Sequence, residues 1–324
     1  MEKLALDPLT RHAQKKETKF TGFIGTLIKN KVLLLFLLPG LIVMVVNNYL
    51  PMAGLIAAFK NIDYAKGLLG SPFVGFKNFR FLFATSDAWE ITRNTVLYNL
   101  VFIFLGLFIN VVVAICLNEI HRKRLAKLFQ TIYMLPYFLS MVVVAYAVYG
   151  FLNPGTGFIN TALLPAFGIN PIDWYLEPKY WVILLPLVNF WVYTGVGSVI
   201  YIASITGIDG QMFEAAVVDG ATKIQQIIHI TLPTIKPVMV IMTLLSLGNI
   251  FRGNFGLFYQ VPMASPALLS VTNVIDTYVY RAMTTSADMG LVMAASFYQS
   301  VVGCVMVVLA NFAVRKIDEG SSLF

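Results

Sequence analysis

The sequence predicts an all-α integral membrane protein with six transmembrane helices. Hydrophobic residues make up 58% of the 324 positions and charged residues only 12%, whereas a soluble globular chain carries about 25% charged residues. The mean hydropathy is correspondingly high, at +0.77. The apolar runs are long enough to cross a bilayer as helices rather than as the strands of a barrel.

Apolar runs separated by polar stretches define the predicted spans. In chain order they cover residues 32–59, 95–117, 128–152, 181–205, 237–258 and 289–314. Pro39 interrupts the first run, and Pro136 lies inside the third. The predicted organisation is a basic segment over residues 1–31, a six-span transmembrane domain over residues 32–316 and a tail over residues 317–324.

Basic residues orient the predicted spans. Arg122, Lys123, Arg124 and Lys127 crowd the short loop between the second and third runs, and the positive-inside rule is strongest for such loops. The N-terminal segment is also basic, and it lacks the small-residue cleavage site of a removable signal peptide. We therefore expect both termini and the polar loop over residues 206–236 to face the cytoplasm.

The loop over residues 206–236 predicts a short amphipathic helix. Its apolar residues recur at roughly helical spacing; they are Phe213, Val217, Ile224, Ile227 and Ile228. Such a helix could lie on the bilayer surface and fill space, or it could dock a cytoplasmic partner. Periodicity alone leaves both interpretations open.

Several residues of this loop predict where the helix begins and ends. Asp209 stands where an N-cap is expected, before the first helical residue. Asp219 and Lys223 are four residues apart and are expected to pair on the exposed face, with Gly220 inside the same helix. Pro233 and the proline four residues after it are expected to end the helix.

The loop also carries a specific string of residues. Glu214-Ala215-Ala216, Gly220, Ile230 and Leu232-Pro233 stand at the spacing of the signature loop of binding-protein-dependent ABC importer permeases, and the chain resembles that family. The resemblance implies that the loop contacts an ATPase subunit. The residues that it assigns to this coupling are Glu214, Ala215, Ala216, Asp219, Gly220, Leu232 and Pro233.

The resemblance extends beyond the loop. Residues 273–281 and 299–311 are similar to the C-terminal third of the oligosaccharide and polysaccharide branch of these permeases. The resemblance implies a type I ABC importer permease fold in a bacterial inner membrane. It also implies a second homologous permease, two cytoplasmic ATPase subunits that bind ATP and Mg, and an extracytoplasmic solute-binding protein that delivers the sugar.

Other chemistry is not expected in this chain. The sequence contains no G-x-x-x-x-G-K-[S/T] motif, so no P-loop and no ATP hydrolysis by the chain itself are expected. Cys116 and Cys304 lie in apolar runs and are expected to be buried small hydrophobic residues. His12, His121 and His229 are far apart, and no metal site is predicted from them.

Polar residues inside the fourth and fifth predicted spans are candidates for a substrate path. They are Asn189, Trp191, Tyr193, Asn249, Arg252 and Asn254. The asparagines could instead hydrogen-bond between helices, and Arg252 could reach the outer interface. Because a charge at membrane depth is costly and no span carries an acid near its centre, Arg252 favours an acidic sugar of the alginate or uronate kind.

Two other functional classes fit the sequence less well. A secondary transporter driven by an ion gradient is the alternative function, and it would need carboxylates within the membrane. Glu90 and Glu119 lie only at span ends. A membrane scaffold would leave the signature loop unexplained.

Overall fold

The computed structural model describes residues 25–26, 29–285 and 288–317. The predicted basic segment and the predicted tail therefore lie almost wholly outside the described residues. Contacts within the chain divide it into two units, Met1–Leu55 and Ile56–Phe324.

From Lys31 on, the described part of the first unit is one long apolar helix. It consists of α2 (Lys31–Met44), the π-helical turn η2 (Val45–Tyr49) and α3 (Leu50–Met52), and it leads into the 3₁₀ helix η3 (Ala53–Phe59). Pro39 interrupts the apolar run, yet it lies inside α2 and does not end it, and the helical segment Lys31–Phe59 agrees with the first predicted span. Membrane helices tolerate proline because small local adjustments satisfy the freed backbone carbonyl.

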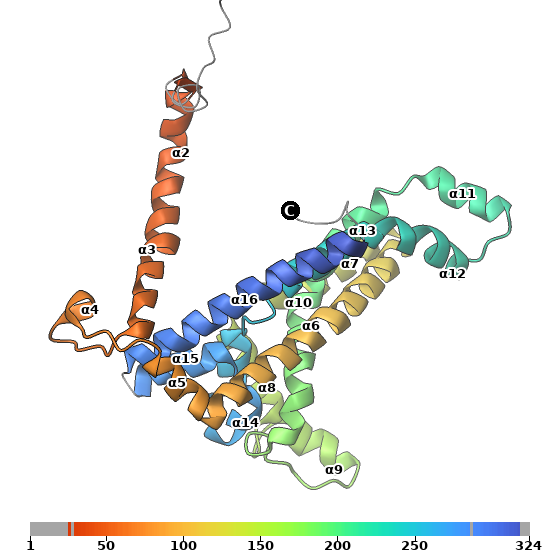
Figure 1. Cartoon of the computed structure of the whole chain (residues 1–324). Coiled ribbons are helices and arrows are strands. Elements are labelled where there is room, and N and C mark those ends of the chain that lie inside the picture. The colour runs from red at the N-terminus through yellow and green to blue at the C-terminus, as the bar shows by residue number, and fades with distance from the viewer. Residues whose placement is uncertain (1–24, 27–28, 286–287, 318–324) are drawn as a thin grey trace, which may run out of the picture. The chain divides into compact units, whose positions relative to one another are not determined.

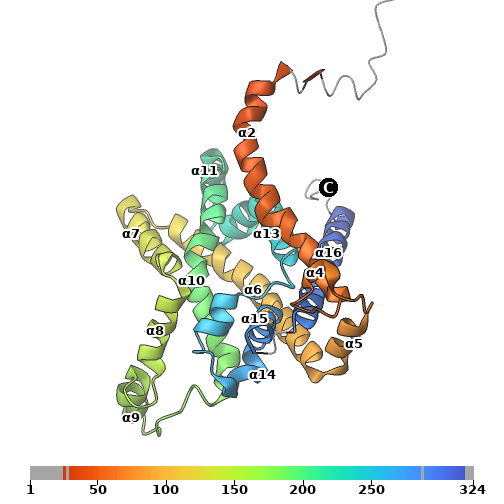
Figure 2. The same cartoon turned by 90° about the vertical axis from the view of Figure 1, so that its left-hand side faces the viewer.

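Long helices form the body of the second unit (Figures 1 and 2). They are α6 (Ser86–Asn118), α10 (Pro178–Thr206), α13 (Leu232–Leu247) and α16 (Met289–Ile317). Among the described residues, five helices are long and apolar enough to cross a membrane, and a bent pair of helices makes a sixth. The predicted all-α, multi-span architecture is therefore confirmed.

Short elements connect these helices. Before α6 they are α4 (Gly67–Gly70) and α5 (Lys77–Ala84). Before α10 they are η5 (Ile159–Leu163) and α9 (Leu164–Ala166). Before α16 they are η7 (Gly256–Gln260), η8 (Pro266–Leu268), α14 (Leu269–Thr272) and α15 (Ile275–Thr285). Both views place α9 and α14 at the opposite end of this unit from α11 (Gly210–Val218).

The third predicted span is broken rather than straight. It consists of α7 (Lys123–Met134), the 3₁₀ turn η4 (Leu135–Phe138) and α8 (Met141–Leu152), with α7 and α8 bent by 102°. Pro136 lies at the break, and the side chain of Ser140 caps α8 by accepting the N–H of Val143 at 3.4 Å. Proline removes a helix hydrogen bond, and the cap starts a new helix.

The fifth predicted span is also displaced. A continuous helical segment covers Lys223–Leu247, made of α12 (Lys223–Gln226), the π-helical turn η6 (Ile227–Thr231) and α13. Pro233 starts α13 and Pro237 lies inside it, so neither ends a helix as predicted. The helix stops at Leu247, and a turn over residues 248–251 follows. Proline has no backbone N–H to donate. A π-helical turn shifts the hydrogen-bond pattern, so the chain can stay helical although that bond is missing.

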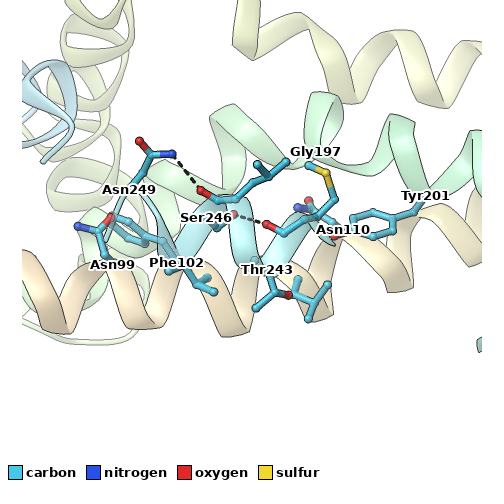
Figure 3. Close-up of a pocket in the computed structure, with 13 residues that line it drawn as sticks. Asn99, Phe102, Asn110, Gly197, Tyr201, Thr243, Ser246 and Asn249 are labelled. Carbon is cyan, nitrogen blue, oxygen red and sulfur yellow. Dashed lines mark hydrogen bonds between the residues drawn. The ribbon is translucent and has the colours of Figure 1, made fainter. Parts of the chain in front are cut away.

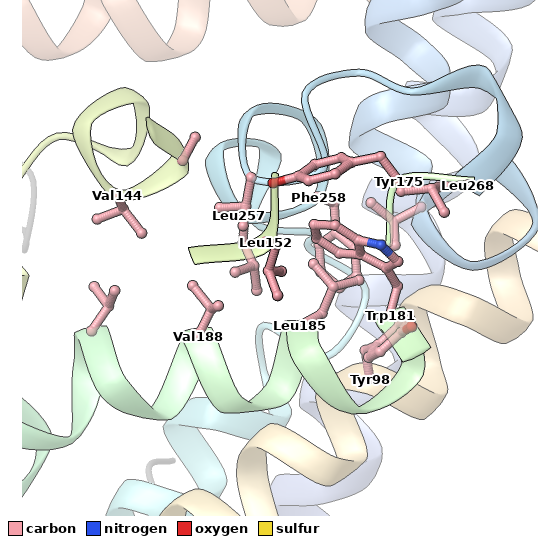
Figure 4. Close-up of a cluster of buried hydrophobic side chains, with 14 residues drawn as sticks. Tyr98, Val144, Leu152, Tyr175, Trp181, Leu185, Val188, Leu257, Phe258 and Leu268 are labelled. Carbon is pink, nitrogen blue, oxygen red and sulfur yellow. The ribbon is translucent and has the colours of Figure 1, made fainter. Parts of the chain in front are cut away.

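Buried side chains hold the second unit together in separate clusters. One cluster joins α10 to α8 and to the segment around η7 (Figure 4). Trp181, Leu185 and Val188 project into it from one face of α10, against Leu257 and Phe258. A second cluster lies between α6, α10 and α13, and its residues include Val111, Tyr201 and Ile235.

The two cysteines are free and exposed. The prediction that Cys116 and Cys304 are buried is therefore wrong for this chain. They belong to α6 and α16, and a membrane helix turns an apolar surface outward as readily as inward, because its surroundings are lipid or other helices. An apolar run predicts a span but does not tell which of its residues face the protein interior.

Candidate functional site

A groove between α6, α10 and α13 is the first candidate site (Figure 3). Its volume is about 420 Å³. Polar side chains line much of it; they are Asn99 and Asn110 from α6, Tyr201 from α10, and Thr243, Ser246 and Asn249 from α13 and the residues after it. Among these only Asn249 was predicted from the sequence.

The polar side chains along α13 hydrogen-bond their own helix. Thr243 and Ser246 donate their hydroxyls to the carbonyls of Met239 and Met242, at 2.7 and 2.8 Å. The amide nitrogen of Asn249 donates to the carbonyl of Leu245 at 3.0 Å (Figure 3). These donors are therefore occupied, while the side-chain oxygens keep lone pairs that can accept hydrogen bonds from a ligand.

Asn110 has a different environment. Its side chain packs against Gly197 of α10, where an added Cβ would lie 2.5 Å from Nδ2 of Asn110. Its oxygen Oδ1 is buried and has no hydrogen-bond partner among the described residues. Because a buried polar atom without a partner is costly, this oxygen calls for a water or a ligand group in the groove.

The predicted path residues do not share one cavity. Asn189 is buried in α10, whereas Trp191 on the same helix is 47% exposed and lines two other grooves. The amide nitrogen of Asn254 donates to the hydroxyl of Tyr193 at 2.8 Å. Asn249 alone of the set lines the polar groove.

Arg252 lies beside the groove rather than within a helix. It lies at the end of the turn that follows α13, so the prediction that it sits inside a helical span is wrong. Its backbone carbonyl accepts a hydrogen bond of 3.1 Å from Asn99, which lines the groove. Its exposed side chain lines a neighbouring cavity of about 380 Å³ with Gln299 and Ser300 of α16.

An acidic residue outside the predicted spans attends Arg252. Asp276 of α15 interacts electrostatically with Arg252. Its carboxylate accepts hydrogen bonds from the backbone N–H of Gly253 and from the side-chain amide of Gln299. Burial raises the pKa of the Asp276 carboxyl, and these donors and the charge of Arg252 oppose that rise.

The signature loop is the second candidate site. Asp209 caps α11 by accepting the N–H of Gln211 at 3.0 Å, which confirms the predicted N-cap. The helix ends at Val218, because Gly220 has φ of +79° and the N–H of the next residue returns to the carbonyl of Ala216. The single helix predicted through Gly220 is therefore wrong.

The second half of the loop begins with its own cap. Thr222 and Gln225 form a capping box at the start of α12. Lys223 forms an ion pair of 3.3 Å with Glu119 at the end of α6. Lys223 thus does not make the predicted pair with Asp219, because Asp219 lies beyond the end of α11 and not on a shared helix.

The coupling residues fall into two groups. Glu214, Ala215, Asp219 and Gly220 are exposed, and Ala216 is half-buried, on α11 and the turn after it, which project from the end of the second unit (Figures 1 and 2). Apolar side chains around them are exposed as well; Val217 is 60%, Val218 87% and Ile224 69% exposed. Leu232 and Pro233 lie where the loop meets α13, and Leu232 packs against the cluster between the long helices.

Known proteins resemble the chain over most of its length. A Bacillus subtilis polygalacturonan/rhamnogalacturonan transport system permease protein, YteP, is 32% identical over 304 residues, which cover 94% of each chain. Protein LplB of the same organism is 29% identical, over 93% of this chain and 94% of that protein. No family model matches the chain.

Solved structures also resemble the chain over most of its length. A bacterial ABC transporter involved in the import of the acidic polysaccharide alginate contains a chain that superposes with a TM-score of 0.83 and 31% identity. The match covers 91% of this chain and 99% of the other. A second structure, of the alginate transporter in complex with an alginate pentasaccharide-bound periplasmic protein, gives a TM-score of 0.81.

Proposed function

The chain belongs to the permease subunits of ABC sugar importers, and we propose that it carries an acidic oligo- or polysaccharide across a bacterial inner membrane. YteP is named for polygalacturonan and rhamnogalacturonan, and the alginate transporter for alginate. All three polymers contain uronic acids, which carry one carboxylate on each such sugar unit. The substrate class that we propose is therefore a uronate-containing saccharide.

The observation that carries this proposal is the polar groove together with the exposed Arg252, whose side chain lines the neighbouring cavity. Saccharide hydroxyls can donate to the oxygens of Asn110, Thr243 and Ser246, and Asn110 has an acceptor without a partner. A saccharide carboxylate can accept a charge-assisted bond from Arg252. Asp276 offsets part of that positive charge, which keeps the contact weak enough for the sugar to move on.

The partners follow from the family. We propose that a second, similar permease completes the pathway and that a solute-binding protein delivers the sugar, as a periplasmic protein does in the alginate complex. Two ATPase subunits hold ATP and Mg, and this chain itself hydrolyses no ATP. Both termini and the signature loop face the cytoplasm, where those ATPases can reach Glu214.

The signature loop can pass mechanical work to the spans. Exposed apolar and small residues on α11 fit a groove on an ATPase subunit. The ion pair between Lys223 and Glu119 ties the loop to α6, which lines the polar groove at Asn99 and Asn110. Movement of the docked loop is thereby coupled to the helix that faces the sugar.

Transport by the reconstituted complex tests the proposal. The full transporter in proteoliposomes, with its delivery protein outside, should take up a uronate oligomer only when ATP is inside. A neutral oligomer of equal length should enter more slowly. Uptake driven by an ion gradient without ATP would contradict the proposal and support a secondary transporter, which the known relatives do not favour.

A further inference from the structure

An apolar groove separate from the polar one lies between α6, α7 and α10. Its volume is about 510 Å³. Large apolar side chains line it; they include Ile109 and Val113 from α6, Ile132 and Tyr133 from α7, and Phe190 and Trp191 from α10. The family and the transport proposal give this groove no role.

The break between α7 and α8 shapes this groove. Pro136 lies in the break and lines the groove, and α8 leaves α7 at 102°. The end of α7 is held against α10, since a Cβ added to Gly195 would lie only 2.1 Å from the carbonyl oxygen of Tyr133. Close backbone contact therefore fixes the position of the end of α7 against α10 beside the groove.

Cations gather at the start of α7. Arg122, Lys123, Arg124 and Lys127 are all exposed, and none forms an ion pair with a described carboxylate. Large apolar side chains are exposed farther along the same helix; Leu128 is 53% and Ile132 55% exposed. A basic end on an exposed apolar helix is typical of a surface that meets anionic lipid.

We propose that the apolar groove binds one acyl chain of an anionic phospholipid, whose phosphate lies against Arg122, Lys123 and Arg124. The dimensions agree with this arrangement. Ten residues separate Lys123 from Tyr133, which is about 15 Å along a helix. One leaflet of hydrocarbon is also about 15 Å deep, half of a core of about 30 Å.

The charge at the start of α7 favours a lipid over a helix of another subunit. A phospholipid offers a phosphate and an apolar chain on one molecule, so it can satisfy the cations and fill the groove together. A transmembrane helix in the groove would bury apolar surface but would leave those cations without a partner, unless it ended in acidic residues. The site should therefore discriminate between lipids by headgroup charge.

Native mass spectrometry of the purified transporter tests the proposal. The complex is titrated with phosphatidylglycerol and, separately, with phosphatidylcholine of the same chains. We expect phosphatidylglycerol to be retained selectively on this chain. The double variant Arg122→Gln/Arg124→Gln should weaken its binding roughly 30-fold, from about fivefold for each lost cation near a lipid surface.

Matched variants distinguish the contribution of the headgroup to binding from that of the groove. Lys77→Gln/Arg80→Gln removes two exposed cations from α5 and should leave phosphatidylglycerol binding unchanged. Val113→Phe fills the groove and should reduce binding of long-chain lipid, while the same subunits still purify together. Inorganic phosphate in excess should not displace the lipid, because it has no chain for the groove.

Other outcomes would overturn the proposal. Equal retention of both lipids would mean that the cations do not distinguish an anionic headgroup from a zwitterionic one. Displacement by inorganic phosphate would assign the cations to a free anion. If no lipid is retained and a cysteine at Ile132 instead cross-links to another permease subunit, the groove belongs to a subunit contact.

Discussion

The side-chain amide of Asn99 donates a hydrogen bond of 3.1 Å to the backbone carbonyl of Arg252. The same amide donates to the carbonyl of Thr95 within α6, at 2.8 Å. Asn99 therefore joins the helix that lines the polar groove to the turn that carries the arginine. The position of the charge beside the groove depends on a contact between residues 153 positions apart in the chain.

Replacing Asn99 with leucine tests this link. Asn99→Leu keeps the side-chain size but removes a hydrogen bond worth about 1 kcal/mol, so uptake should fall about fivefold for acidic and neutral saccharides alike. Asn48→Leu is the matched control, because Asn48 also donates to a carbonyl four residues earlier but lies in the first unit. Equal uptake by both variants would show that the link does not matter for transport.

The charge of Arg252 should decide between acidic and neutral saccharides. Arg252→Gln keeps hydrogen-bond donors but removes the charge, so uptake of a uronate oligomer should fall roughly tenfold. Uptake of a neutral oligomer of equal length should stay nearly unchanged. Arg80→Gln removes another exposed arginine and is the control. If Arg252→Gln leaves both rates as they were, the arginine only reaches the membrane surface and takes no part in substrate choice.

Hydropathy predicted most of the spans well, but it displaced the fifth span and did not locate the break in the third. The observed α10 and α16 agree with the runs over residues 181–205 and 289–314 to within a few residues. Proline alone could not locate the bend, since Pro39 and Pro186 lie inside continuous helices while Pro136 lies at a 102° break. The bend also needs the cap at Ser140 and the close contact between Gly195 and Tyr133, and the second of these is tertiary.

The polar groove was only partly predictable. Asn99 and Asn110 are eleven positions apart in one apolar run, about three helical turns, so they share a face. That signal was present in the sequence and could have identified them. The approach of Asp276 to Arg252 was not predictable, because it depends on α15 folding back against the turn after α13.

Gly220 should be more sensitive to substitution than Gly210 of the same loop. Its φ of +79° is unfavourable for alanine by about 1–2 kcal/mol, so Gly220→Ala should reshape the end of α11 and weaken the stimulation of ATP hydrolysis by substrate. Gly210→Ala is the control, because Gly210 has open space around it and no positive φ. Substrate-stimulated ATPase activity of the whole complex is the measurement. Full stimulation in Gly220→Ala would argue against a docking role for this turn.

Cysteine labelling should show on which side of the membrane each end of the spans lies. Cys116 and Cys304 are exposed, so both are first replaced with serine. In intact spheroplasts, a cysteine at Lys77 should react with an impermeant maleimide and one at Lys123 should not, because the positive-inside rule predicts that the basic loop faces the cytoplasm. Labelling at Lys123 but not at Lys77 would invert the proposed orientation.

The ion pair between Glu119 and Lys223 should act in coupling more than in stability. Both side chains are partly exposed, and such a pair contributes less than about 1 kcal/mol to folding. Glu119→Lys places two cations together and should push the loop away from α6, so ATP hydrolysis should continue while sugar uptake falls.

Adding Lys223→Glu to that variant reverses the pair and should restore most of the lost uptake. The measured quantity is the number of sugars taken up for each ATP hydrolysed, which separates coupling from assembly. Lys236→Glu offers the control, because Lys236 is an exposed cation on α13 without a described ion pair. If the reversed pair transports no better than Glu119→Lys alone, the two residues act independently. The loop would then transmit its movement through the packing of Leu232 against the long helices.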